Sequence, residues 1–130
     1  EGEVVWVAGP AEEGVLEEVR AQSRGRDVKA VESPPLPDLA ALLSEARGYV
    51  GCDSGVTHLA AACGAPTVAL FGPTDPAVWG PRGERVVTLR RNAGCESCKQ
   101  GEKSGHTCLA EIAVEEVLEA VLGFGPPGGP

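Results

Sequence analysis

Short apolar runs alternate with amphipathic runs along most of this chain, and this alternation limits its fold more than any other feature. Apolar, β-branched runs predict strands at residues 4–8, 28–31, 49–52, 66–71 and 85–89. Apolar side chains at helical spacing predict helices at residues 12–22, 38–46, 56–62 and 113–122. This order indicates an α/β domain with a parallel sheet, right-handed crossovers and helices on both faces.

Other segments interrupt this pattern. Pro34, Pro35 and Pro37 are expected to prevent a helix before residue 38. Residues 90–108 are polar and contain glycine and cysteine, which predicts an irregular excursion over the surface. The Gly- and Pro-rich residues 124–130 predict a flexible tail. Residues 1–123 are therefore expected to form one domain.

The composition argues against some binding partners and some cellular compartments for this domain. Its 130 residues include 19 acidic and 11 basic side chains, a formal net charge of −8, which disfavours nucleic acid as a partner. Any bound anion must then be held by local dipoles. The five cysteines are an odd number, which favours a reducing cytoplasm over a secreted disulfide framework. The chain contains no Met, and we expect it to be a piece of a longer protein.

Asp53, Ser54 and Gly55 lie between a predicted strand and a predicted helix, where α/β domains bind ligands. The free N–H groups of a helix start favour an anion. Gly55 lets a phosphate approach the backbone, and the Ser54 hydroxyl donates a further hydrogen bond. His58 follows Ser54 by about one helical turn, so its ring reaches the same pocket. The alternative is that Asp53 or Ser54 only caps the helix and His58 is an ordinary histidine.

A second candidate loop follows the predicted strand 66–71. Thr74 and Asp75 lie in this loop, and it shares the sheet edge of Asp53, because parallel strands end at the same edge. The alternative is a rigid turn in which Thr74 or Asp75 caps a short helical turn.

These two loops carry a family resemblance. Residues 50–62 and 64–76 read VGCDSGVTHLAAA and GAPTVALFGPTDP, and this long, ordered stretch resembles the signature of glycosyltransferase family 9, the ADP-heptose:lipopolysaccharide heptosyltransferases and their relatives. Weaker similarity extends to residues 9–13 and 36–46. Residues 95–98 and 105–109 resemble a cysteine-rich stretch found in part of the family, although the additional Cys that is common between those two groups is absent here.

The resemblance implies the C-terminal half of a GT-B glycosyltransferase, a Rossmann-like domain that binds the nucleotide-sugar donor opposite an acceptor-binding N-terminal half. By this resemblance the start of the helix at Ser54 and Gly55 holds the donor diphosphate. Asp53 and His58 then contact the diphosphate or the sugar.

Further donor contacts are implied in the same way. Glu12 or Glu13 is expected to bind the ribose or the sugar hydroxyls, and residues 34–36 are expected to meet the adenine through backbone groups. Thr74 and Asp75 are expected to line the sugar end of the cleft.

The family also implies an inverting reaction with no catalytic metal and no cofactor. Its carboxylate base belongs to the other half, and a basic residue that pairs with the diphosphate is expected before Glu1, so neither lies in this chain. We expect the chain alone to bind nucleotide weakly without turnover. The longer protein is expected in the cytoplasm, peripheral to the inner membrane, with a lipopolysaccharide-type acceptor.

The cysteines leave several interpretations open. Cys95, Cys98, His106 and Cys108 are enough ligands for a tetrahedral zinc site, but a disulfide within the Cys-x-x-Cys pair or unliganded thiols in a loop also explain them. The other two cysteines, Cys52 and Cys63, follow apolar neighbours and are expected to be packing residues.

Two other functions stay open besides the donor-binding half of a glycosyltransferase. One is a non-catalytic module that binds a nucleotide or a sugar phosphate. The other is the donor domain of a GT-B enzyme that uses a UDP-sugar.

Overall fold

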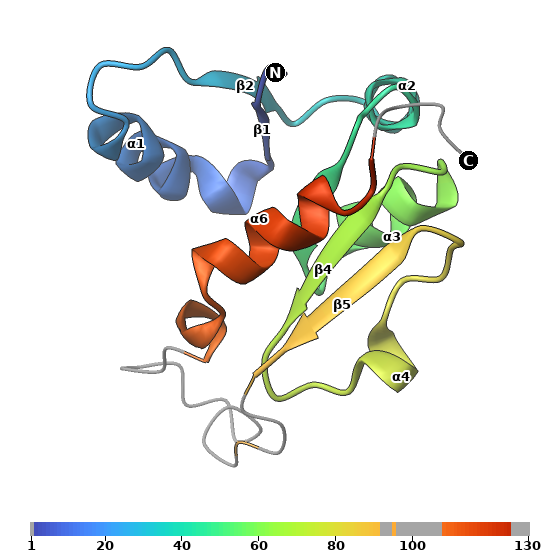
Figure 1. The fold of residues 1–130 in the computed structure, drawn as a ribbon. Coiled ribbons are helices and arrows are strands. Elements are labelled where there is room, and N and C mark those ends of the chain that lie inside the picture. Colours follow the sequence, from blue (N-terminus) through green and yellow to red (C-terminus); the bar gives the residue numbers. More distant parts are fainter. Residues whose placement is uncertain (1, 92–94, 96–107, 126–130) are drawn as a thin grey trace. The chain divides into compact units, whose positions relative to one another are not determined.

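A computed structural model describes residues 2–91, 95 and 108–125, which divide between two compact units, residues 1–39 and 40–130. Both units contain parallel strands joined by helices (Figure 1). This α/β architecture confirms the expected fold class. Within these residues no helix combines the length and the apolar character needed to cross a membrane.

Unit 1 contains a strand–helix–strand motif. Strand β1 (Val5–Ala8) leads through a 3-10 turn (Pro10–Glu12) into helix α1 (Glu13–Gln22), and the chain returns as β2 (Lys29–Glu32). The two strands pair in parallel from Val5 opposite Lys29 to Ala8 opposite Glu32. Parallel strands require such a crossover, because a tight hairpin joins only antiparallel strands.

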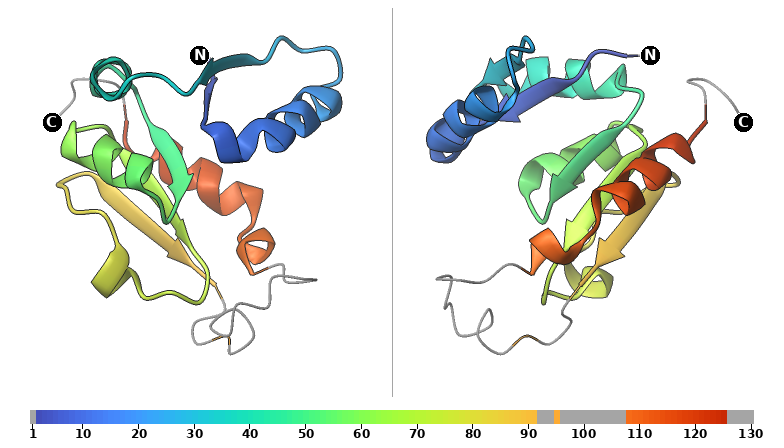
Figure 2. Two further views of the ribbon diagram at one scale, coloured as in Figure 1. Left: turned by 180° about the vertical axis from the view of Figure 1, so that it is seen from behind. Right: turned by 60° about the vertical axis from the view of Figure 1, so that its left-hand side comes forward.

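Unit 2 contains a three-stranded parallel sheet in the order β3-β4-β5. Its strands and the helices beside them are β3 (Tyr49–Cys52), α3 (Gly55–Ala62), β4 (Thr67–Phe71), α4 (Pro76–Trp79), β5 (Val86–Arg90) and α6 (Val114–Leu122). A 3-10 turn, Leu109–Glu111, precedes α6. Helices α3 and α6 cover opposite faces of this sheet (Figures 1 and 2).

The central strand β4 carries most of the core of unit 2. Val68 and Ala69 are fully buried and Phe71 is 1% exposed, as expected for a parallel strand that is covered on both faces. On α3 the small side chains of Ala60 and Ala61 are buried as well, so the helix packs close to the sheet. This packing fixes where β3 and β4 end, and with them the loops that follow.

The predicted strands and helices lie within two residues of their expected bounds, whereas α4 is not among the predicted helices. Helix α2 (Leu36–Ser44) corrects one prediction. Pro35 and Pro37 do not delay this helix to residue 38, because the helix begins at Leu36 and includes Pro37 in its first turn. The N–H groups of a first turn have no acceptor within the helix, so proline is tolerated there. Within each unit the strands pair in parallel, in the order β1-β2 in unit 1 and β3-β4-β5 in unit 2.

Candidate functional site

The 53–55 turn and the 72–75 loop follow neighbouring strands of unit 2. Strands β3 and β4 pair in parallel with Cys52 opposite Leu70, so both chains leave the sheet at the same edge. In an open parallel sheet this carboxyl edge is where ligands bind. The structure therefore brings the two candidate loops of the sequence to one edge.

Ser54 is the N-cap of α3. Its backbone is extended, with φ −156° and ψ 163°, and its Oγ accepts a hydrogen bond from Thr57 N at 3.4 Å. The first bond along the helix runs from His58 N to Ser54 O at 3.3 Å. Asp53, Ser54, Gly55 and His58 are all exposed. The predicted residues thus lie together at an accessible helix start, with Ser54 also serving as a cap.

Thr57 organises this helix start, and the sequence reasoning did not identify it. Its hydroxyl donates to Cys52 O at 2.6 Å and lies 3.2 Å from both Ser54 Oγ and Tyr49 Oη. The side chain is only 1% exposed. A Thr three residues after a Ser cap is a weak signal in a sequence, because the partners on the strand are visible only once β3 and α3 are packed together.

Gly51 makes room for this hydrogen-bond network. A Cβ at Gly51 would lie 2.6 Å from Thr57 Oγ1 and closer still to Tyr49 Oη. Real Cβ atoms do not come this close, so Tyr49 reaches Thr57 only because residue 51 has no side chain.

Cys52 corrects another prediction. It was expected to pack in apolar surroundings, but it is exposed at the end of β3, while Cys63 is half-buried. Successive side chains of a strand point to opposite faces of the sheet, and Cys52 shares the exposed face of β3 with Val50. Desolvation of the Cys52 thiol, and then the charge of Asp53, raise its pKa above the ordinary value. The thiol is therefore protonated at neutral pH.

In the 72–75 loop, Asp75 caps the short helix α4. Its Oδ1 accepts a hydrogen bond from Ala77 N at 3.0 Å, and Pro76 occupies the first position of the helix. Thr74 and Asp75 are exposed. The cap accounts for the local role of Asp75 and leaves the Thr74 side chain accessible.

The other predicted contacts lie in unit 1, in the segments that follow β1 and β2. Glu12 Oε2 accepts a hydrogen bond from Gly9 N at 2.7 Å, which closes the turn after β1, and Glu13 begins α1. After β2, Ser33 has a left-handed backbone with φ 45° and donates its N–H to Ala8 O at 2.8 Å. Leu36, the last residue of the expected adenine loop, is exposed at the start of α2.

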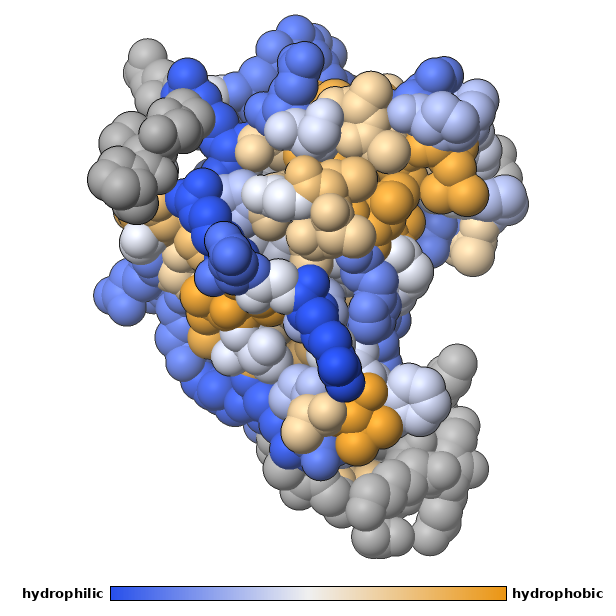
Figure 3. Space-filling view, turned by 90° about the vertical axis from the view of Figure 1, so that its right-hand side faces the viewer, coloured by the Kyte–Doolittle hydropathy of each residue, from blue (hydrophilic) through white to orange (hydrophobic). Residues whose placement is uncertain are grey.

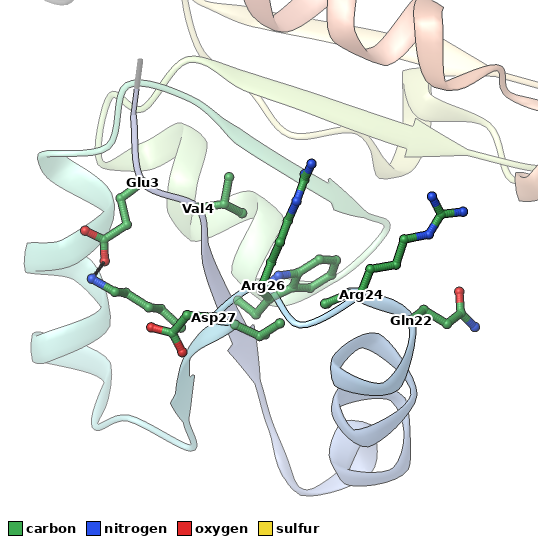
Figure 4. Close-up of a pocket in the computed structure, with 10 residues that line it drawn as sticks. Glu3, Val4, Gln22, Arg24, Arg26 and Asp27 are labelled. Atoms are coloured by element: carbon green, nitrogen blue, oxygen red, sulfur yellow. Dashed lines mark ion pairs between the residues drawn. The ribbon is translucent and has the colours of Figure 1, made fainter.

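Unit 1 also contains a cavity of about 670 Å³ (Figure 4). Trp6 lines it together with Arg24 and Arg26 from the turn between α1 and β2. Lys29 forms an ion pair with Glu3 at 2.5 Å in its wall, and this contact raises the pKa of Lys29. No predicted site residue lines this cavity, so it does not coincide with the loops described above.

The zinc and disulfide interpretations depend on residues beyond those described. Cys95 is half-buried and Cys108 is buried, whereas Cys98 and His106 fall outside the described residues. Within residues 2–91, 95 and 108–125, no group of three or more Cys, His, Asp or Glu side chains is placed to hold a metal ion.

Comparison with known proteins connects these loops to one family. Residues 1–108 match the model of glycosyltransferase family 9 (heptosyltransferase). The chain is 32% identical over 127 residues to lipooligosaccharide heptosyltransferase 2 of Haemophilus influenzae, a match that covers 92% of this chain and 37% of that protein. It is 43% identical over 63 residues to lipopolysaccharide heptosyltransferase 1 of Pseudomonas aeruginosa, covering 48% of this chain and 18% of that protein.

A solved structure gives the same result. The fold is similar to a glycosyl transferase family 9 crystal structure from Veillonella parvula, with a TM-score of 0.74 and 27% identity over 92% of this chain and 35% of that one. The chain thus spans well under half the length of the relatives that it matches. The family match, the relatives and the fold agree, and the chain belongs to glycosyltransferase family 9, the heptosyltransferases.

Proposed function

We propose that residues 1–123 are the donor-binding half of an inverting heptosyltransferase and that the donor is an ADP-heptose-like nucleotide sugar. The observation that carries this proposal is the exposed 53–55 turn, which leads into α3 at the sheet edge shared with the 72–75 loop. Membership of the heptosyltransferase family supports it.

The helix start suits a diphosphate. The N–H groups of Gly55 and Val56 lie in the first turn, where no acceptor exists within a helix, and the helix dipole favours an anion there. A Cβ at Gly55 would have no atom within 4 Å, so the surface in front of this backbone is open. Asp53 and His58 flank the same turn, and we assign them contacts with the diphosphate or the sugar.

Other residues would contact the remaining parts of the donor. We assign Glu12 or Glu13 to the ribose or sugar hydroxyls and residues 34–36 to the adenine. Thr74 and Asp75 would line the sugar end. These assignments rest on the family resemblance and on the placement of each group after a strand.

In the proposed reaction, a hydroxyl oxygen of a lipopolysaccharide-type acceptor attacks the anomeric carbon of the donor. The bond from that carbon to the diphosphate oxygen breaks, ADP leaves, and the configuration inverts. The acceptor proton passes to a carboxylate base that we place in the acceptor-binding half, outside this chain. The N–H groups of the α3 start would stabilise the charge that develops on the leaving diphosphate.

Calorimetric titration of the 130-residue chain with ADP, UDP and ADP-heptose tests the proposal. ADP should bind more tightly than UDP, and His58→Ala should weaken ADP binding about tenfold, the effect of losing one polar contact to a charged ligand. Asp53→Ala should weaken ADP-heptose binding relative to ADP, because a carboxylate can accept hydrogen bonds from the sugar hydroxyls but not from the diphosphate. Glu119→Ala removes an exposed carboxylate on α6 and should leave the affinity unchanged. Tighter binding of UDP would favour a UDP-sugar donor, and no binding of any nucleotide would contradict the proposal.

Gly55→Ala separates ligand binding from folding. The added methyl group meets no protein atom, and replacing glycine within a helix should stabilise the fold by about 0.5–1 kcal/mol. The same methyl group would obstruct a phosphate at the helix start, so ADP affinity should fall while thermal stability rises. Gly2→Ala also places its methyl group in open space and is the matched control. Unchanged ADP affinity in Gly55→Ala would contradict phosphate binding at this turn.

A further inference from the structure

Arg90 reaches from the end of β5 to the 72–75 loop. It is the last residue of this strand and pairs with Phe71, the last residue of β4. One terminal nitrogen of its guanidinium donates a hydrogen bond to Pro73 O at 3.2 Å, and the other lies 3.7 Å from Asp75 Oδ1. The Arg90 side chain on β5 thus holds the loop that follows β4.

These contacts lie on both sides of Thr74. Pro73 precedes Thr74, and Asp75, which follows it, is itself bound to the start of α4 through Ala77 N. The same oxygen, Asp75 Oδ1, therefore faces both Arg90 and the helix start. The main chain at Thr74 is held from its two neighbours, whereas its own side chain is exposed.

The charge of Arg90 also matters at this edge. Asp75 is a carboxylate beside a site for which an anionic donor is proposed, and an uncompensated negative charge there would repel it. Arg90 supplies the compensating charge. Its Nε is buried and has no hydrogen-bond partner among the described residues, an arrangement that costs folding free energy.

We propose that Arg90 is a positioning residue that fixes the 72–75 loop, and with it Thr74, at the sugar end of the donor site. This inference rests on the proposed function, because it takes the loop to face the donor sugar. Arg90 acts through the loop and is not assigned a contact with the donor.

The neighbouring Arg91 provides a matched control. Its backbone N–H donates to Phe71 O at 3.0 Å, but its guanidinium forms an ion pair with Glu116 on α6. Arg91→Gln therefore makes the same change in charge one residue away. It removes the hydrogen bond from Arg91 Nη1 to Arg90 O, at 2.9 Å, but no described contact with the 72–75 loop. Arg90→Lys keeps the charge but, with a single ammonium group, cannot reproduce the planar fork of Arg that faces Pro73 O and Asp75 together.

The test compares the affinities of the 130-residue chain for ADP and for ADP-heptose, a pair of probes that differ in the sugar. Arg90→Gln should reduce the preference for ADP-heptose over ADP about tenfold, the effect expected when a polar contact to a charged group is lost. Arg90→Lys should have a preference for ADP-heptose between those of the unaltered chain and Arg90→Gln. Arg91→Gln should keep the preference of the unaltered chain. A uniform loss of stability would weaken both ligands together and would not change this ratio.

Amide hydrogen exchange gives a readout that needs no ligand. The amide of Ala77 should exchange faster in Arg90→Gln than in Arg91→Gln, because its acceptor Asp75 loses one partner. An unchanged preference of Arg90→Gln for ADP-heptose over ADP would overturn the inference, and so would equal exchange of the Ala77 amide in Arg90→Gln and Arg91→Gln. The proposed function would still be decided separately, by the Asp53→Ala and Gly55→Ala results. Absence of nucleotide binding in the unaltered chain would instead overturn the proposed function and this inference with it.

Discussion

One hydroxyl group connects the last residues of β3 to the first turn of α3. The Thr57 oxygen has Cys52 O, Ser54 Oγ and Tyr49 Oη within hydrogen-bond distance. It can donate to the carbonyl and accept from the two hydroxyls, so its donor and acceptor capacity is used. The geometry of the proposed diphosphate site therefore depends on a residue that is not itself exposed to the ligand.

Thr57→Val should destabilise the chain more than Thr57→Ser does. Valine has nearly the shape of threonine but lacks the hydroxyl, so the variant loses the contacts to Tyr49, Ser54 and Cys52. This loss should lower the free energy of unfolding by about 1–3 kcal/mol. Serine keeps the hydroxyl and loses only a buried methyl group, which is worth about 0.8 kcal/mol. Urea unfolding of the three proteins measures the difference. Equal stability of the Val and Ser variants would contradict a contribution of these hydrogen bonds to the stability of the chain.

Residues whose position depends on neighbours in the chain were predictable from the sequence. Asp53, Ser54, Gly55 and His58 follow a strand signal and precede a helix signal, and the structure places them at an exposed helix start. Thr57 was not predictable in this way, because its partner Tyr49 is brought to it only by packing.

The start of α6 is stabilised by a charged side chain. Glu116 lies in the first turn, where its Oε2 accepts a hydrogen bond from Ala113 N at 3.0 Å, and its other oxygen pairs with Arg91. The backbone hydrogen bond from Ala113, and then the contact with Arg91, lower the pKa of Glu116. The ionised form of Glu116 thus holds both the helix start and the chain that follows β5.

This lowered pKa predicts a pH-dependent stability. A carboxyl group whose pKa is lower in the folded state stabilises the fold above its unfolded pKa, near 4.3. That contribution disappears as the pH falls through the folded pKa, because both states are then protonated. The wild-type chain should be more stable than Glu116→Gln at pH 7, and the difference should vanish well below pH 4. Urea unfolding of both proteins across this range measures it, and a constant difference would contradict the assignment.

Most elements were predictable from periodicity, but their pairing was not. The expected strand 49–52 matches β3, and helix 113–122 differs from α6 by one residue. The prolines place the start of α2 too late, because a proline in the first turn, such as Pro37, does not prevent a helix. Pairing joins strands that are far apart in the sequence, so the strand order within each unit carried no local signal.

The net charge of the whole chain sets a condition on any nucleotide that it binds. The formal charge is −8, and hydrophilic residues surround apolar patches on the face shown in Figure 3. A field of this sign repels a polyphosphate. Attraction must therefore come from short-range groups such as the first N–H groups of α3, and this is the physical reason for testing Gly55 before any distant charge.

The two units differ in the structure available to stabilise each of them. Unit 1 has two paired strands and buries the apolar side chains Ala8, Leu16 and Leu39. Unit 2 has three strands, with β4 almost entirely buried between two helices. A two-stranded sheet is marginally stable by itself, whereas three strands with a covered face sustain a core. Unit 1 is therefore expected to open more readily.

Amide hydrogen exchange of the 130-residue chain should reveal this difference. Amides in β2, such as that of Val31, should exchange at least about tenfold faster than those of Val68 and Ala69 in β4, because local opening of unit 1 requires less free energy than global unfolding. Low urea should accelerate exchange in unit 1 first. The opposite result would be that the amides of both units have the same free energy of opening and the same dependence on urea. The chain would then unfold as a single cooperative body, and the two units would not differ in stability.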